Sequence, residues 1–265
     1  MTQPRRPVTQ HATPVSDQVG PAGGLSRELA LCMLPTRAAG QGRSAGRARA
    51  ARDQPGCLTA SPMTVPGWAI VSSGLSPVLL VGAWLVADAV QAASYSPIRQ
   101  TISALAGYAG IDRWIMTGAL VLVGGSYIVT AVGVGGVRAP ARVLLAAAGL
   151  STIGIAASPQ PASGPTLQHL AWTVVAAITI AAWPAFAASR RPSRPLVLSP
   201  GVCAAAIGVS TALLGWLLIE SQGGGDLGLA ERLTTSAQAT WPFIVAVALR
   251  RTARRADRGP AAGTG

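Results

Sequence analysis

The sequence predicts an all-α integral membrane protein built around a bundle of six transmembrane helices. Half of the 265 residues are hydrophobic and only 11% are charged, whereas roughly a quarter of the residues in a soluble domain are charged. From Trp68 onward the chain also repeats apolar runs of about 20 residues, the length at which a helix crosses the hydrocarbon layer of a bilayer. These two observations exclude an ordinary water-soluble globule and a fully disordered chain.

The first 62 residues differ in composition from the rest. They are rich in Pro, Gly, Ala, Ser and Arg, and their apolar run at 29–34 is shorter than the core of a secretory signal, roughly 7–15 residues. We therefore predict a disordered tail over 1–62, with the alternative that translation starts at Met63, just before the first apolar run. A six-helix domain over 63–250 and a basic tail over 251–265 complete the predicted organisation.

Six apolar runs are assigned as membrane spans because helices satisfy their own backbone hydrogen bonds in lipid. After the first span, Ile98, Ile102 and Leu105 recur at helical spacing. This spacing predicts a short interfacial helix on the outer surface, before the second span. The predicted spans are 66–88, 114–134, 141–158, 167–188, 196–219 and 233–249.

The placement of the arginines predicts the orientation of the chain. The sequence contains 21 basic residues, all of them Arg, and 9 acidic residues, which gives a formal net charge of +12. Basic residues next to spans favour the cytoplasmic side, so we expect a plasma-membrane protein with both termini in the cytoplasm. This arrangement accounts for the charge without a nucleic-acid partner. The predicted cytoplasmic arginines are Arg138, Arg142, Arg190, Arg191, Arg194, Arg250, Arg251, Arg254, Arg255 and Arg258.

Two of the predicted hairpins resemble each other on the outer side. The pattern Arg-x-Thr-x-Ser-Ala-x-Ala occurs at 99–106 and again at 232–239, and an acidic residue ends the preceding span in both hairpins. The likeness predicts an internal repeat, a common feature of membrane transporters. The alternative is chance matching in a chain rich in Ala, Ser and Thr.

Each acidic residue has a candidate partner. Asp88 with Arg99, and Glu220 or Glu231 with Arg232, are expected to form ion pairs that hold the hairpins, because a carboxylate at membrane depth is costly when unpaired. The alternative is that the guanidinium groups bind an anionic head group or substrate, since their planar fork suits phosphate and carboxylate.

His169 is the one histidine on this side, and it stands at the start of the fourth span. It either caps the helix or bonds a loop carbonyl, or it relays protons or binds a metal with Asp88 and Glu220. We predict no metal site, no cofactor and no catalytic set, since no recognisable motif for one is present. The predicted ligand-binding cluster on the outer side comprises Asp88, Arg99, Thr101, Ser103, His169, Glu220, Glu231 and Arg232.

Three segments resemble the bacterial and archaeal membrane family called domain of unknown function 998. They are Tyr95–Ser103, Ser158–His169 with its Ser-Pro-Gln-Pro start, and Gly228–Leu233. The resemblance implies a six-helix membrane protein with no assigned activity. The family often carries an acidic residue soon after the Ser of the first segment, where this chain has Ala104. The Arg-only, Ala-rich composition is also typical of actinobacterial proteins.

We expect the chain to bind or transport a small or lipid-like ligand through an outward-facing polar pocket. The bilayer is the expected partner, with an anionic lipid or a small molecule as the ligand; the oligomeric state is left open. One alternative is a structural or assembly subunit whose polar residues only join helices. Another is a membrane enzyme that acts on a lipid head group and needs an acid–base set among Asp88, His169 and Glu220.

Overall fold

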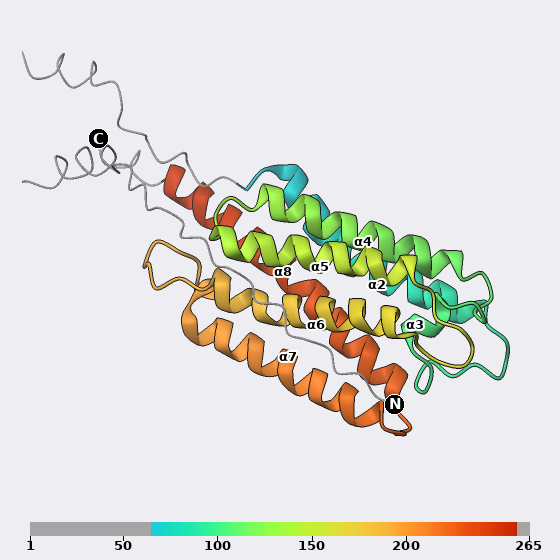
Figure 1. The fold of residues 1–265 in the computed structure, drawn as a ribbon. Helices are drawn as coiled ribbons and strands as arrows, with labels where there is room; N and C mark the ends of the chain where they lie inside the picture. Colours follow the sequence, from blue (N-terminus) through green and yellow to red (C-terminus); the bar gives the residue numbers. More distant parts are fainter. Residues whose placement is uncertain (1–64, 259–265) are drawn as a thin grey trace, which may run out of the picture. The chain divides into compact units, whose positions relative to one another are not determined.

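A computed structural model describes residues 65–258. The predictions of a disordered tail over 1–62 and of a start at Met63 lie outside the described residues. Within the described part the chain is all-α and contains no strand, as predicted (Figure 1). Its elements are α2 (Gly67–Ala89), α3 (Ile102–Leu105), α4 (Trp114–Gly133), α5 (Ala139–Ala157), α6 (Leu167–Ala187), the 3-10 turn η1 (Leu196–Leu198), α7 (Pro200–Glu220) and α8 (Leu227–Asp257).

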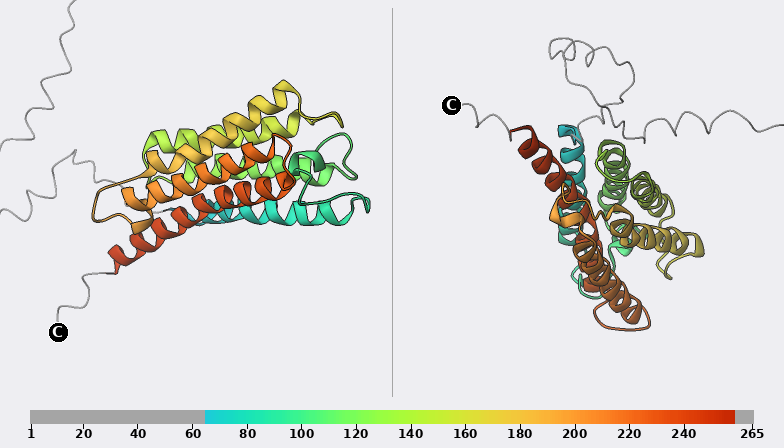
Figure 2. Two further views of the ribbon diagram at one scale, coloured as in Figure 1. Left: turned by 90° about the horizontal axis from the view of Figure 1, so that it is seen from below. Right: turned by 90° about the vertical axis from the view of Figure 1, so that its left-hand side faces the viewer.

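The six long helices form a ring. Each packs mainly against two neighbours, in the order α2, α4, α5, α6, α7, α8 and back to α2, and they run roughly alongside one another (Figure 2). The short helix α3 lies in the α2–α4 connection and contacts α2 and α8. We call the end of the bundle that carries the C-terminus of α2 and the N-terminus of α8 the Asp88 end, and the opposite end the arginine end.

The closest approach between neighbouring helices is between α4 and α5. A Cβ atom built at Gly124 would meet the carbonyl oxygen of Gly149, and one built at Gly149 would meet the carbonyl oxygen of Gly124. Two facing glycines therefore let the two backbones touch, the arrangement that small residues allow between membrane helices. Near the arginine end, the Ser72 and Thr130 hydroxyls join α2 to α4 at 2.8 Å.

Five of the helices, α2, α4, α5, α6 and α7, are long and apolar enough to cross a membrane. Large apolar side chains such as Val78, Leu122 and Ile178 are more than half exposed on them. A soluble monomer rarely exposes apolar surface on this scale, so the chain is a multi-pass membrane protein.

The structure differs from the predicted elements in two places. The fifth predicted span, 196–219, begins with the separate turn η1, because Ser199 and Pro200 start a new helix and the Ser199 hydroxyl caps it. The predicted interfacial helix is a single turn, α3, whose Ile102 and Leu105 side chains are buried in the protein, while Ile98 is exposed.

The sixth predicted span, 233–249, lies within α8, a helix of 31 residues. Helix α8 is not among the five helices apolar enough to cross a membrane. Thr234, Thr235, Ser236 and Gln238 lower its hydropathy near one end. A sixth span therefore stays a prediction.

The contact between α4 and α5 gives a matched pair of variants. We expect Gly124→Ala to destabilise the protein by about 1–3 kcal/mol, because the new methyl group meets the backbone of α5. Gly125→Ala is the control, since a Cβ there meets nothing within 4 Å, and it should leave stability unchanged or raise it by up to about 1 kcal/mol. Thermal unfolding in mild detergent measures both; equal effects would contradict the packing.

Candidate functional site

Arg232, in the second turn of α8, is the centre of the polar residues at the Asp88 end. Its side chain is 5% exposed, and its Nη2 atom lies 2.7 Å from Oδ1 of Asp88 at the end of α2. Within residues 65–258 this is the one ion pair between side chains. The pair therefore joins the first and the last helix of the ring. The expected pairing of Asp88 with Arg99 is wrong, because α2 packs beside α8, which brings Arg232 to Asp88, and Arg99 is exposed on the α2–α4 connection.

Tyr95 completes a three-membered network with this pair. Its hydroxyl donates to Oδ1 of Asp88 at 2.7 Å and accepts from Nη2 of Arg232 at 2.5 Å. Burial raises the pKa of the Tyr95 phenol, and the hydrogen bond to Asp88 raises it further. The phenol therefore stays protonated at neutral pH and keeps donating to the carboxylate.

The remaining contacts of Arg232 hold the connection between α2 and α4. Nη1 donates to the carbonyl oxygens of Pro97 at 2.6 Å, Gln100 at 2.8 Å and Gly228 at 3.2 Å. The guanidinium group also lies 5.3 Å from the centre of the Trp84 ring, a cation–π contact. Both Nη atoms of Arg232 are therefore bonded within the protein, while its buried Nε atom has no hydrogen-bond partner among the described residues.

Gly228 permits this arrangement. A Cβ atom at this position would collide with the carbonyl oxygens of Gln100 and Pro97, two of the acceptors of Arg232. The next residue, Leu229, donates its backbone N–H to the carbonyl oxygen of Ile98 at 3.0 Å. The start of α8 and the α2–α4 connection are thus in direct backbone contact.

Glu231 precedes Arg232 and faces α3. Its carboxylate accepts hydrogen bonds from the backbone N–H of Ile102 and from the Ser103 hydroxyl, the latter at 3.1 Å. Because consecutive helical residues point about 100° apart, Arg232 reaches the α2–α4 connection while Glu231 reaches the centre of the ring. Glu231 therefore holds α3 against α8.

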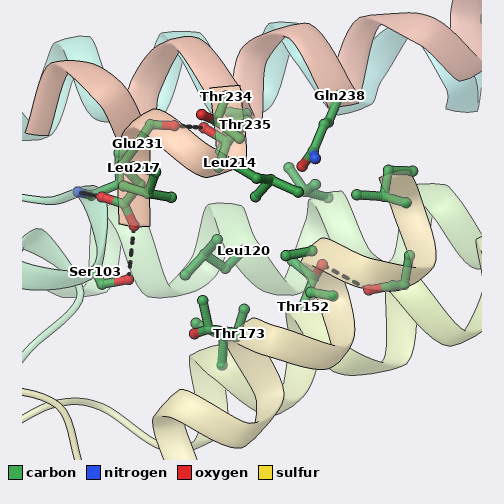
Figure 3. A pocket seen from close by; sticks show the side chains of 18 of the residues that line it. Ser103, Leu120, Thr152, Thr173, Leu214, Leu217, Glu231, Thr234, Thr235 and Gln238 are labelled. Atoms are coloured by element: carbon green, nitrogen blue, oxygen red, sulfur yellow. Dashed lines mark hydrogen bonds between the residues drawn. The ribbon is translucent and has the colours of Figure 1, made fainter. Parts of the chain in front are cut away.

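A central cavity of about 120 Å³ lies beside Glu231. All six long helices and α3 contribute to its lining, which is mostly apolar (Figure 3). Glu231 and Ser103 lie on one side of the cavity. Gln238, about two turns further along α8, extends its side chain toward the cavity from the other side. Gln238 is 7% exposed, and its Nε2 atom has no hydrogen-bond partner among the described residues.

The other predicted site residues do not join this group. Thr101 caps α3 by accepting from the backbone N–H of Ala104 at 3.0 Å. Glu220 closes the turn between α7 and α8, accepting from Nε1 of Trp216 and from the backbone N–H of Asp226. Of the eight predicted residues, the structure brings Asp88, Ser103, Glu231 and Arg232 together around the start of α8.

His169 bonds a loop carbonyl, the simpler of its two expected roles. It is 4% exposed, and its Nδ1 atom lies 2.7 Å from the carbonyl oxygen of Ser158. Its backbone N–H is capped by the Thr166 hydroxyl. Across residues 65–258, no three His, Cys, Asp or Glu side chains lie close enough together to hold a metal ion.

A pocket that opens at the Asp88 end is lined by residues other than the predicted cluster. It has a volume of about 270 Å³, and its polar side chains are Gln91, Tyr95, Gln100 and Gln160. None of the eight predicted site residues lines it.

Two residues that matter were not among the predicted site residues. Tyr95 itself entered the sequence analysis only as the first residue of a segment that resembles a known family. Gln238 had a usable signal, since it is a polar side chain inside a predicted span, and such residues usually face the interior of a bundle.

The three segments that resemble a known family meet at the Asp88 end. Tyr95 bonds Arg232 and Ser103 bonds Glu231, which joins the first segment to the third, and Gln160 of the second segment lines the same pocket as Tyr95 and Gln100. A family model described as "Protein of unknown function (DUF998)" matches residues 75–248, more than half of the chain. The chain belongs to this family. No curated protein and no solved structure matches it, so membership of DUF998 assigns no activity.

The buried pair in this DUF998 protein can be tested with two arginines that occupy equivalent places in the repeated pattern. Arg232→Ala should destabilise the protein by about 3 kcal/mol, because it leaves Asp88, whose side chain is 15% exposed, without its partner and removes the bonds to the α2–α4 connection. Arg99→Ala removes the same charge from an exposed side chain and should change stability by no more than about 0.5 kcal/mol. Thermal unfolding in mild detergent measures both; a similar loss in the two variants would contradict the stabilising role of the Asp88–Arg232 pair.

Proposed function

We propose that the protein binds a small, lipid-like molecule in the central cavity, beneath the cap formed by α3. This proposal moves the expected binding site from an outward-facing polar pocket to the centre of the ring. The observation that carries it is a mostly apolar cavity with Glu231 and Gln238 on its border. An engineered cavity of about 150 Å³ in another protein binds benzene, so a cavity of about 120 Å³ suits a ring or a short stretch of hydrocarbon chain.

The polar side chains on the border favour a ligand with one hydroxyl group or similar polar end. Each oxygen of the Glu231 carboxylate receives one hydrogen bond from α3 and keeps acceptor capacity for a ligand donor. The amide of Gln238 brings an unpartnered donor, which an acceptor on the ligand would satisfy. The proposed ligand is therefore mostly apolar with a single hydrogen-bonding end.

A second candidate function is structural, and the contacts of Arg232 favour it for the Asp88–Arg232 pair. Both Nη atoms of this arginine are bonded within the protein, which leaves the pair suited to joining α2 and α8. We assign the pair this positioning role and keep ligand binding for the cavity.

We also propose that α8 supplies the sixth span and that the arginine end faces the cytoplasm, so that both termini are cytoplasmic. The ten arginines at this end support the orientation through the positive-inside rule. The Asp88 end would then face outward.

The cavity proposal is tested by identifying what co-purifies with the full chain. Ala177 lines the cavity on α6, and Ala177→Phe should reduce the co-purified lipid by about tenfold or more, because the ring occupies its space. Val175→Phe is the control on the same helix, since Val175 is 42% exposed and lies outside the cavity lining. Mass spectrometry of lipid extracts measures both. The same extract from wild type and Ala177→Phe would reject the cavity as the binding site.

The orientation is tested by cysteine accessibility in intact cells, in a chain whose own Cys32, Cys57 and Cys203 are replaced by Ser. A membrane-impermeant maleimide should label Gly225→Cys, between α7 and α8, and miss Pro192→Cys, between α6 and α7. The reverse labelling would invert the proposed threading. Labelling of both in broken cells is the control that both cysteines are reachable.

A further inference from the structure

The arginine end contains a concave site that no other part of the proposed function uses. A cavity of about 640 Å³ lies between the α4–α5 and α6–α7 connections. Four arginines line it: Arg138 from the first connection, and Arg190, Arg191 and Arg194 from the second. The sequence analysis counted these residues only as markers of orientation, and the fold gathers them around one space.

The positive charge of this cavity is uncompensated. No carboxylate lines it, and among the described residues the one ion pair between side chains lies at the Asp88 end. Burial lowers the pKa of the Arg194 guanidinium, and the neighbouring charge of Arg191 lowers it further. Like charges held together in this way are relieved when an anion enters between them.

The site is also held in shape by the chain itself. Nη1 of Arg194 donates to the carbonyl oxygen of Gly136 at 2.5 Å, which ties the two connections together across the cavity. The backbone N–H of Ser189 donates to the carbonyl oxygen of Leu198 at 2.7 Å, which closes the α6–α7 connection. The side chains of Arg138, Arg190 and Arg191 are exposed and free of hydrogen bonds to other described residues.

We propose that this cavity binds a phosphate group through Arg138, Arg190, Arg191 and Arg194. A guanidinium fork matches the geometry of phosphate oxygens and can bond two of them at once. The phosphate could belong to the head group of an anionic lipid, since the cavity lies where the apolar helices end, or it could be free in solution. The alternative is a general electrostatic attraction between anionic surfaces and the arginines at the C-terminal end of α8. This attraction would not require the cavity, so variants of the two groups of arginines distinguish the two explanations.

The test compares two double variants of the full chain that remove equal charge. Arg190→Gln/Arg191→Gln empties the cavity of two exposed guanidiniums that make no side-chain hydrogen bond to described residues. Arg254→Gln/Arg258→Gln removes two exposed arginines from the end of α8, which line none of the cavities described above. Arg138→Gln, on the other connection, is a third variant that affects the site without touching the α6–α7 connection.

Binding of phosphatidylglycerol is followed by native mass spectrometry in detergent, with phosphatidylcholine as the zwitterionic control, and binding of inorganic phosphate by the shift in thermal midpoint. We expect Arg190→Gln/Arg191→Gln to weaken binding by about tenfold or more. Arg138→Gln should also weaken binding. Arg254→Gln/Arg258→Gln should change binding by less than about twofold. Binding of phosphatidylglycerol alone identifies a lipid phosphate as the ligand; inorganic phosphate binding with the same dependence on arginine identifies a free phosphate. Equal losses in the two double variants, or no preference of the wild type for either phosphate probe over phosphatidylcholine, would overturn the proposal.

Discussion

The ion pair between Arg232 and Asp88 is the interaction on which the arrangement at one end of the bundle depends. It joins the first helix of the ring to the last, two segments separated by most of the membrane domain. A charge taken out of water is costly unless it is paired and its other hydrogen bonds are satisfied. Tyr95 and the carbonyl oxygens of the α2–α4 connection accept hydrogen bonds from the two Nη atoms of Arg232, and its Nε atom alone is left without a partner among the described residues. The connection is therefore ordered by the same arginine that closes the ring.

No helix runs through the centre of the ring, so only side chains occupy it. Because each long helix packs mainly against two neighbours, no helix fills the middle, and the central cavity is bordered by all of them. Helix α7 is the least embedded member, since Cys203 is its one buried residue. Two neighbouring residues at the start of α8 face different parts of the protein. The Glu231 carboxylate faces the central cavity and α3, and the Arg232 guanidinium faces the part of the α2–α4 connection that precedes α3. Glu231 and Arg232 thus attach α3 and the residues before it to α8.

The sequence was sufficient to predict the helical class and the bounds of the first four long helices to within about two residues, because uninterrupted apolar runs are a strong signal. It could also identify Asp88 and Arg232 as members of the polar group. It could not pair them, since ion-pair partners depend on which helices are neighbours, and the repeated pattern favoured Arg99 instead. The burial of Ile102 and Leu105 was hidden for a similar reason: helical spacing indicates an apolar face without indicating whether lipid or protein covers it.

The length of α8 has a geometric consequence. At 1.5 Å per residue, its 31 residues extend about 46 Å, well beyond the roughly 30 Å thickness of a hydrocarbon core. Helix α8, which contains Pro242, therefore has the Asp88 pair in its second turn and a row of guanidiniums at its far end. The helix is therefore long enough for its two charged ends to reach opposite faces of a hydrocarbon layer at the same time.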